Sequence, residues 1–280
     1  MDPATRKRVG NWAKMVIGAE EVGKFYSLPF NDAGFGYDTY GAQREIVLAA
    51  YVVGLTLYRN YFRVESGGIG NIPSNGPLIL AANRAGPAPF SAFMAFVDMI
   101  TKNPSPRVLR IATRASIKGL PYVGLMLQRI GQVVDTPRNL ELVLKRGEAL
   151  LMHPEKRSNP IKSLLKKKRV STFLTPFIEL CLRLRAPIVP VGFYSSEQHL
   201  PFLGSAKSIA SKLKLSLLPI KLNLSLLGLL SALPLPAKFH IRYGMPINFF
   251  EEYPPETTEH PNLLRQMSEV VQERVEELIS

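Results

Sequence analysis

The sequence predicts an α/β protein built on a mainly parallel β-sheet that is flanked by helices. From about residue 63 onward, short apolar runs alternate with helical patterns, as in parallel strands joined by crossover helices. The chain has 280 residues and is 46% hydrophobic, which is enough for a full core. We expect one domain, with a helical N-terminal segment at 1–62, an α/β core at 63–250 and a C-terminal amphipathic helix within 251–280.

Helices are expected before the sheet. Basic and apolar positions alternate over residues 1–28, which indicates a helix from Val9 to Tyr26, and 29–40 reads as a loop. In 41–62 apolar side chains recur every three or four positions, which predicts a helix with one face in the core.

The elements of the core are expected to alternate along the chain. The expected strands are Arg63 to Glu65, Leu78 to Ala82, Val108 to Ala112, Gln132 to Val134, Ala149 to His153, Ile188 to Phe193 and Phe239 to Tyr243. The expected helices are Ala92 to Ile100, Tyr122 to Ile130, Leu140 to Arg146 and Phe173 to Arg185. After the last strand, His260 to Ser280 places apolar side chains along one side, as an amphipathic helix does.

The charge favours some partners over others. A net charge of +13 suits phospholipid headgroups or anionic thioesters. Nucleic acid is not expected, because the basic residues are not interleaved with exposed aromatic residues and no binding motif is present. No metal site is expected from one cysteine and four scattered histidines. A scattered basic set comprises Arg107, Arg110, Arg114 and Lys118.

The segment from Pro77 to Phe96 is where we expect the functional site. A buried-strand run ends at Asn83, a loop rich in glycine and proline follows, and a helical pattern begins near Ser91. In α/β proteins, the loop between the end of a strand and the next helix is a common place for binding and catalytic groups.

Four blocks of sequence, in order, resemble the glycerolipid acyltransferase superfamily, and most closely its bacterial monoacylglycerol-acyltransferase-like branch. They are GPLILAANRAGPAPF, LPYVGLMLQRIGQVVDTPRN, GEALLMHPEKRS and APIVPVGF, and FHIRYGMPINF resembles the closing strand of the family. The resemblance covers roughly residues 30–250. It implies a glycerolipid-acyltransferase-like fold and transfer of an acyl group from acyl-CoA or an acyl carrier protein to a lipid hydroxyl, without a further cofactor.

The resemblance also implies a histidine and an aspartate in the first block. In the family the histidine takes the proton from the acceptor hydroxyl, and the aspartate orients its ring. Here Arg84 stands at the histidine position, and Pro89, or Phe90 or Ser91 at longer spacings, stands at the aspartate position. Because arginine keeps its proton, with a pKa above about 12, Arg84 cannot serve as a general base. The sequence therefore predicts impaired catalysis.

In the third block, His153 replaces the usual phenylalanine and Lys156 replaces a glycine. The phosphate-contacting arginine of the family is either Arg157, with one residue deleted, or is replaced by Ser158. The residues that the resemblance implies for substrate binding are Asn83, Arg84, Gly86, Arg138, Pro154, Glu155 and Arg157.

Three functions follow from these observations. The first is an impaired acyltransferase-fold protein that binds an acyl lipid or acyl thioester, with Arg84 either binding an anionic headgroup or pairing with Glu155. The second is an active O-acyltransferase in which His153 replaces the missing base, although the sequence favours the reading in which His153 packs in place of an aromatic side chain. The third is a scaffold subunit that partners an active paralogue.

Two basic segments favour a membrane surface. Lys166, Lys167, Lys168 and Arg169 form a basic run, which could also be a solvated loop. Lys212, Lys214 and Lys221 lie in the leucine-rich segment 203–236, which could also be a buried lid. Each cation at an anionic bilayer adds roughly 1 kcal/mol to binding. Since no secretory signal is present and the apolar run 46–57 is too short to span a bilayer, we expect a cytoplasmic protein, peripheral on the inner face of the membrane.

Overall fold

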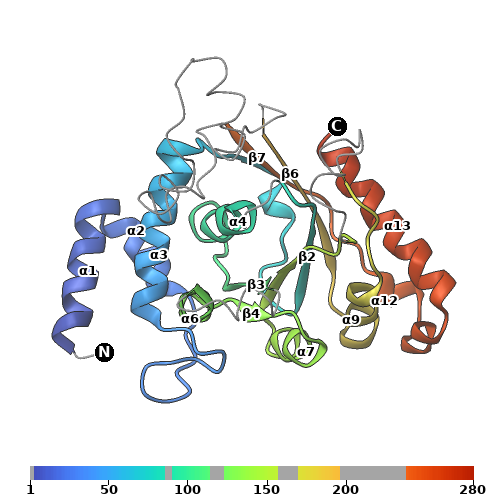
Figure 1. The fold of residues 1–280 in the computed structure, drawn as a ribbon, viewed down its shortest axis with the longest axis horizontal. Coiled ribbons are helices and arrows are strands. Elements are labelled where there is room, and N and C mark those ends of the chain that lie inside the picture. Colours follow the sequence, from blue (N-terminus) through green and yellow to red (C-terminus); the bar gives the residue numbers. More distant parts are fainter. Residues whose placement is uncertain (1–2, 86–89, 114–122, 157–169, 196–237) are drawn as a thin grey trace, which may run out of the picture.

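A computed structural model describes residues 3–85, 90–113, 123–156, 170–195 and 238–280. Its centre is a seven-stranded sheet with helices on both faces (Figure 1), which confirms the predicted α/β class. The strands are β1 (Glu65–Gly67), β2 (Leu78–Ala82), β3 (Leu109–Thr113), β4 (Val133–Val134), β5 (Ala149–Met152), β6 (Ile188–Ser195) and β7 (Phe239–Tyr243). Their order in the sheet is β1-β7-β6-β2-β5-β3-β4, and every neighbouring pair is parallel except β6 and β7.

The predicted strands agree closely with the observed ones. Two of them, Leu78 to Ala82 and Phe239 to Tyr243, match to the residue. The strand predicted from Arg63 is wrong in position, since β1 begins at Glu65. Arg63 has a φ of 43°, in the left-handed region, and such a residue cannot continue an extended strand.

The helices flank the sheet as expected, with one correction. They are α1 (Pro3–Ile17), α2 (Ala19–Ser27), α3 (Arg44–Thr56), α4 (Phe90–Thr101), α6 (Val123–Arg129), α7 (Pro137–Lys145), α9 (Pro176–Leu184), α12 (Phe249–Glu252) and α13 (Pro261–Leu278). The single helix predicted from Val9 to Tyr26 is wrong. The chain breaks between α1 and α2 at Gly18, whose φ of 88° is a conformation that glycine adopts at little cost.

The strand β2 lies at the centre of two cores. Its five residues are all buried, and successive side chains point to opposite faces of the sheet. Leu78, Leu80 and Ala82 pack into one cluster with residues of α3 and α4, whereas Ile79 and Ala81 pack into another with residues of α7, α9 and α13. This burial fixes the position of the residues that follow β2.

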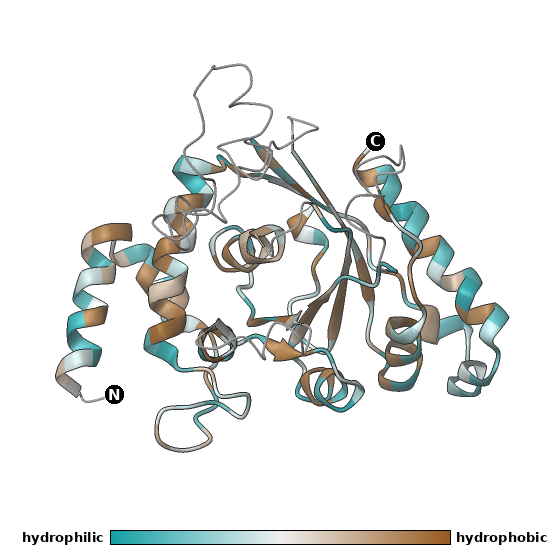
Figure 2. Ribbon diagram, viewed as in Figure 1, coloured by the Kyte–Doolittle hydropathy of each residue, from teal (hydrophilic) through white to brown (hydrophobic). Residues whose placement is uncertain are grey.

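A buried carboxylate lies inside α4, which is otherwise almost wholly apolar (Figure 2). Asp98 is fully buried, and its two oxygens accept hydrogen bonds from the hydroxyls of Tyr58, at 2.6 Å, and Tyr243, at 3.0 Å. Tyr58 lies in a π-helical turn after α3, at Leu57–Tyr61, and Tyr243 ends β7. The carboxylate therefore ties three elements together inside the first cluster.

Two members of the scattered basic set have structural roles. The Arg107 guanidinium donates hydrogen bonds to backbone carbonyls, among them Pro73, at 2.7 Å, and Gly147, at 2.9 Å. Arg110 is buried between the carboxylates of Asp38, at 2.7 Å, and Glu148, at 2.6 Å. Arg110 thus ties the loop before α3 to the sheet, and Arg114 and Lys118 lie outside the described residues.

The helix α13 packs very close to the sheet at Gly192 of β6. A Cβ atom at Gly192 would lie 2.8 Å from side-chain atoms of both Leu278 and Ile279, which is too close for any larger residue. None of the helices in the described part of the chain combines the length and hydropathy that a bilayer-crossing segment needs.

Candidate functional site

The site lies where β2 and β5 end side by side. The two strands are parallel, with Ala81 opposite Met152, so the residues that follow each strand leave the sheet at the same edge. Asn83 is buried at this edge. Its side-chain amide donates to the carbonyl of Phe193, at 2.9 Å, and its side-chain oxygen accepts from the amide of Phe193, at 2.7 Å. Asn83 thereby extends the pairing of β2 with β6 by one residue and fixes the start of the loop.

Arg84 follows Asn83 and faces the carboxylate of Glu155. The Nε of Arg84 lies 3.8 Å from Oε2 of Glu155, and the side chains are 37% and 7% exposed respectively. Burial raises the pKa of the Glu155 carboxyl, and the backbone amides of Arg84 and Ser171 and the Arg84 charge only partly oppose this. The Arg84–Glu155 pair thus joins a buried carboxylate to an arginine side chain that is partly exposed.

Glu155 is held in place by its own segment of chain. The backbone on either side of it pairs with the backbone near Phe173: Lys156 donates to the carbonyl of Thr172, and Leu174 donates to that of Pro154. Residues 154–156 and 172–174 thus form a short antiparallel ladder beside Arg84.

His153 lies between β5 and β2. Its Nδ1 is 3.1 Å from the carbonyl of Ala82, and its ring centre lies 6.3 Å from that of Phe193. If Nδ1 carries the proton, it donates to this carbonyl and leaves Nε2 as the acceptor nitrogen of the ring. His153 therefore has both an aromatic neighbour, as a packing role requires, and a backbone partner that can set its tautomer.

The structure gathers only some of the predicted residues. Asn83, Arg84, His153, Pro154 and Glu155 come together at the ends of β2 and β5. Ser91 is buried in the first turn of α4. Arg138 is exposed at the start of α7, the helix that follows β4. In the sheet, β5 and β3 lie between β4 and β2, so Arg138 is not at the edge where β2 ends. The other predicted positions lie outside the described residues: Gly86, Pro89, Arg157, Lys166, Lys167, Lys168, Arg169, Lys212, Lys214 and Lys221.

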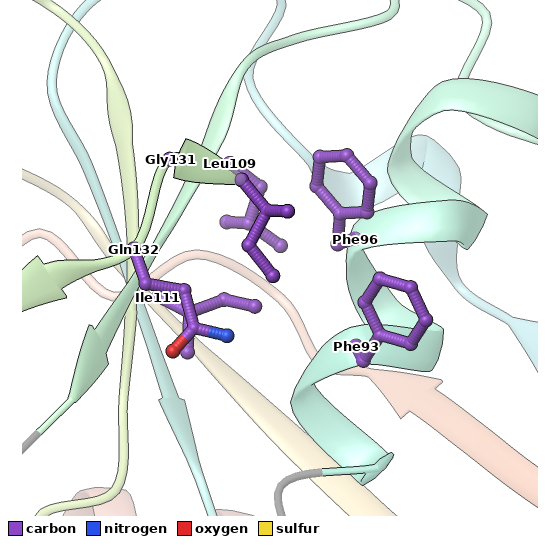
Figure 3. A pocket seen from close by; sticks show the side chains of 7 residues that line it. Phe93, Phe96, Leu109, Ile111, Gly131 and Gln132 are labelled. Atoms are coloured by element: carbon purple, nitrogen blue, oxygen red, sulfur yellow. The ribbon is translucent and has the colours of Figure 1, made fainter. Parts of the chain in front are cut away.

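An apolar recess that the sequence did not reveal lies on the α4 side of the sheet (Figure 3). Phe93 and Phe96 of α4 face Leu109 and Ile111 of β3 across it, and the Gln132 amide lies at its side. The two phenylalanine rings stack with their centres 6.0 Å apart. The space holds little more than a water molecule, so a hydrocarbon chain would enter only if these rings moved.

Comparison with known proteins finds relatives by sequence but no matching family. No family model matches the chain. Uncharacterized proteins of Mycobacterium tuberculosis and Mycobacterium bovis are 29% identical over 79% of this chain and 62% of their own length. One from Mycobacterium leprae is 28% identical over the same share of this chain and 60% of its own. The chain thus spans about three fifths of the length of these relatives.

A solved structure gives the class of the fold. The crystal structure of the 1-acyl-sn-glycerophosphate (LPA) acyltransferase PlsC from Thermotoga maritima aligns with 99% of both chains, with a TM-score of 0.50 and 17% identity. The chain therefore has an acyltransferase-like fold, as its sequence blocks imply. In this fold, the Arg84–Glu155 pair lies at the end of β2.

Proposed function

We propose that this chain binds an acyl lipid, or an acyl thioester, through an anionic group that Arg84 contacts, and that its acyl-transfer activity is impaired. The observation that carries the proposal is a partly exposed arginine side chain next to Asn83, at the edge where β2 and β5 end. Arginine cannot accept the proton of a hydroxyl at neutral pH, but it suits a phosphate or carboxylate, which it binds with two parallel hydrogen bonds.

The fixed charges around Arg84 support this role. Glu155 already accepts hydrogen bonds from backbone amides, and its distance of 3.8 Å from Arg84 is long for an ion pair. Burial also raises the pKa of Glu155, which weakens its hold on the guanidinium as the carboxyl becomes protonated. An anionic headgroup can therefore compete for Arg84.

We expect Arg84→Ala to weaken binding of a short-chain lysophosphatidic acid by about 10- to 100-fold, the effect of one charge-assisted contact. Binding of the matching monoacylglycerol, which lacks the phosphate, should change little. The measurement is isothermal titration calorimetry with the full chain and each lipid below its micelle concentration.

Arg59→Ala is the matched control. Arg59 is 48% exposed and pairs with the buried carboxylate of Glu21, as Arg84 pairs with Glu155. The Arg59→Ala variant should bind lysophosphatidic acid as tightly as the unmodified protein does. If Arg84→Ala weakened the binding of both lipids equally, Arg84 would not recognise the phosphate. The same conclusion would follow if Arg59→Ala weakened the binding of lysophosphatidic acid as much as Arg84→Ala does.

A second function, an active O-acyltransferase, is favoured by one observation: the Ala82 carbonyl lies where it can hold the His153 ring with Nε2 as the base nitrogen. For this function we expect His153→Ala to lower turnover by about 10²–10⁴-fold, the usual contribution of a general base. Product formed from acyl-CoA or an acyl carrier protein thioester and a lysophospholipid or monoacylglycerol would be measured by mass spectrometry.

His260→Ala, at an exposed residue just before α13, is the control and should leave turnover unchanged. Turnover that survives His153→Ala would exclude His153 as the base. No product above a heat-denatured sample, together with phosphate-dependent binding through Arg84, would support the impaired protein instead.

A further inference from the structure

The helix α13 contacts the backbone of the ladder that holds Glu155. It lies on the face of the sheet opposite α4 (Figure 1). The side-chain oxygen of Gln272 accepts a hydrogen bond from the amide of Phe173, at 3.0 Å. The hydroxyl of Ser268, one turn earlier in α13, donates to the carbonyl of Leu174, at 3.4 Å. These two contacts attach α13 to one side of the candidate site.

The amide of Phe173 needs this partner because the ladder does not supply one. The two backbone bonds of the ladder lie on either side of Glu155 and Phe173, which face each other without exchanging a bond. In such a pair the amide of each residue points away from the other strand. Phe173 is buried, so its amide depends on a partner from within the protein. Gln272 occupies the place that a third strand would have.

The segment that Gln272 holds also holds Glu155. Residues that face each other across an antiparallel pair project their side chains to the same face, so the Phe173 ring and the Glu155 carboxylate lie on one side of the ladder. The Phe173 ring packs edge-on against Phe177 of α9, with ring centres 6.2 Å apart. The amide of Ser171, two residues before Phe173, donates to Oε1 of Glu155, at 3.4 Å. A shift of this segment would therefore move or release the carboxylate.

We propose that Gln272 is a positioning residue for the Arg84–Glu155 pair. It fixes the segment that keeps the Glu155 carboxylate 3.8 Å from Nε of Arg84, a separation at which a ligand anion can take the place of the carboxylate. When the bond between Gln272 and Phe173 is removed, the carboxylate is free to close on the guanidinium and to compete with that ligand. The inference rests on the function proposed above for Arg84.

Glu276, one turn after Gln272, sets the orientation of the Gln272 side chain. The Gln272 amide donates to Oε1 of Glu276, at 2.8 Å, which leaves the Gln272 oxygen toward Phe173. The two residues therefore allow a conservative variant, in which Gln272→Glu and Glu276→Gln are combined. A carboxylate oxygen then accepts from Phe173, the amide on the next turn donates to that carboxylate, and the net charge of α13 is unchanged. We call this the exchanged variant, and it keeps both hydrogen bonds.

Calorimetric titration of the full chain with short-chain lysophosphatidic acid and with the matching monoacylglycerol tests the inference. Gln272→Met should weaken binding of lysophosphatidic acid about three- to tenfold and change binding of monoacylglycerol little, because only the phosphate competes with Glu155. The exchanged variant should bind both lipids as the unmodified protein does. The control Gln266→Met changes an exposed glutamine of the same helix and should leave both affinities unchanged.

A double-mutant cycle separates positioning from general damage to the fold. In an Arg84→Ala background, Gln272→Met should have no further effect on lysophosphatidic acid, because the guanidinium that Glu155 competes for is gone. An equal further loss in that background would overturn the inference, as would failure of the exchanged variant to recover the affinity. Far-UV circular dichroism would confirm that each variant is folded.

A measurement without ligand separates this inference from the proposed function. In nuclear magnetic resonance spectra of the free protein, Gln272→Met should speed hydrogen exchange at the Phe173 amide and shift the carboxyl carbon signal of Glu155. The exchanged variant should restore both signals. If lipid binding proves independent of Arg84, the proposed function fails, and a shifted Glu155 signal still supports the positioning role. An unchanged Glu155 signal in Gln272→Met would overturn that role whether or not lipid binds.

Discussion

Asp98→Ala is expected to lower the free energy of unfolding by about 2–5 kcal/mol. The substitution leaves the hydroxyls of Tyr58 and Tyr243 inside an apolar core without their acceptor, and each unsatisfied buried group costs about 1–3 kcal/mol. Urea unfolding followed by circular dichroism would measure the loss. In a Tyr58→Phe, Tyr243→Phe background the same substitution should cost clearly less, because no hydroxyl is then orphaned. An equal cost in both backgrounds would show that the hydroxyls are not responsible.

The same residue predicts a dependence on pH. Burial raises the pKa of Asp98 above its ordinary 3.8, and the hydroxyls of Tyr58, Ser66 and Tyr243 oppose this only in part. A carboxyl whose pKa is raised by folding stabilises the protein most in acid, below its unfolded pKa. That contribution is lost as the pH rises through the folded-state pKa. The stability of the protein relative to Asp98→Asn should therefore fall as the pH rises above the ordinary carboxyl pKa of 3.8, and a constant difference would contradict this assignment.

Arg110→Ala is expected to destabilise the protein by about 3–5 kcal/mol, because it leaves the carboxylates of Asp38 and Glu148 without their buried cation. The control is Arg265→Ala, which removes an exposed ion pair with Glu269 within α13 and should cost at most about 0.5 kcal/mol. Both changes would be measured by urea unfolding under the same conditions.

A compensating variant tests the physical reason. Arg110→Met combined with Asp38→Asn and Glu148→Gln removes the cation and both anions together. It should recover much of the stability lost in Arg110→Ala, since the penalty comes from unpaired buried charge. If the triple variant is as unstable as Arg110→Ala, the loss comes from packing of the arginine stem and its contact with the Tyr40 ring, 4.6 Å away.

Local patterns were sufficient to predict most of the fold. β2 and β7 match to the residue because each is a compact run of strand-forming side chains with clear breaks at its ends. The first helix was wrong because its apolar spacing continues past Gly18, and only the backbone conformation of that glycine reveals the break. β6 and β7 pair in antiparallel fashion. This pairing depends on how the whole sheet is assembled, so local sequence patterns could not predict it.

The candidate site was predictable in part. The approach of Arg84 to Glu155 was one of two expected readings, because both residues follow strands that were correctly placed. The hydrogen bonds of Asn83 to Phe193 were not predictable, because they depend on the register between two strands far apart in sequence. The sequence shows that Asp98 lies within an apolar helix, and a buried acidic residue needs polar partners. It does not show that these partners are Tyr58 and Tyr243.

The pairing of β1 with β7 bears on how the protein is made. Glu65 lies opposite His240, so one edge of the sheet joins an early part of the chain to a late one. During synthesis on the ribosome, β1 emerges long before its neighbour, and β6 has an open edge until β7 follows it. Open strand edges and exposed apolar surface make such intermediates prone to aggregate. Soluble expression should therefore depend on chaperone capacity and growth temperature more than the stability of the finished fold suggests.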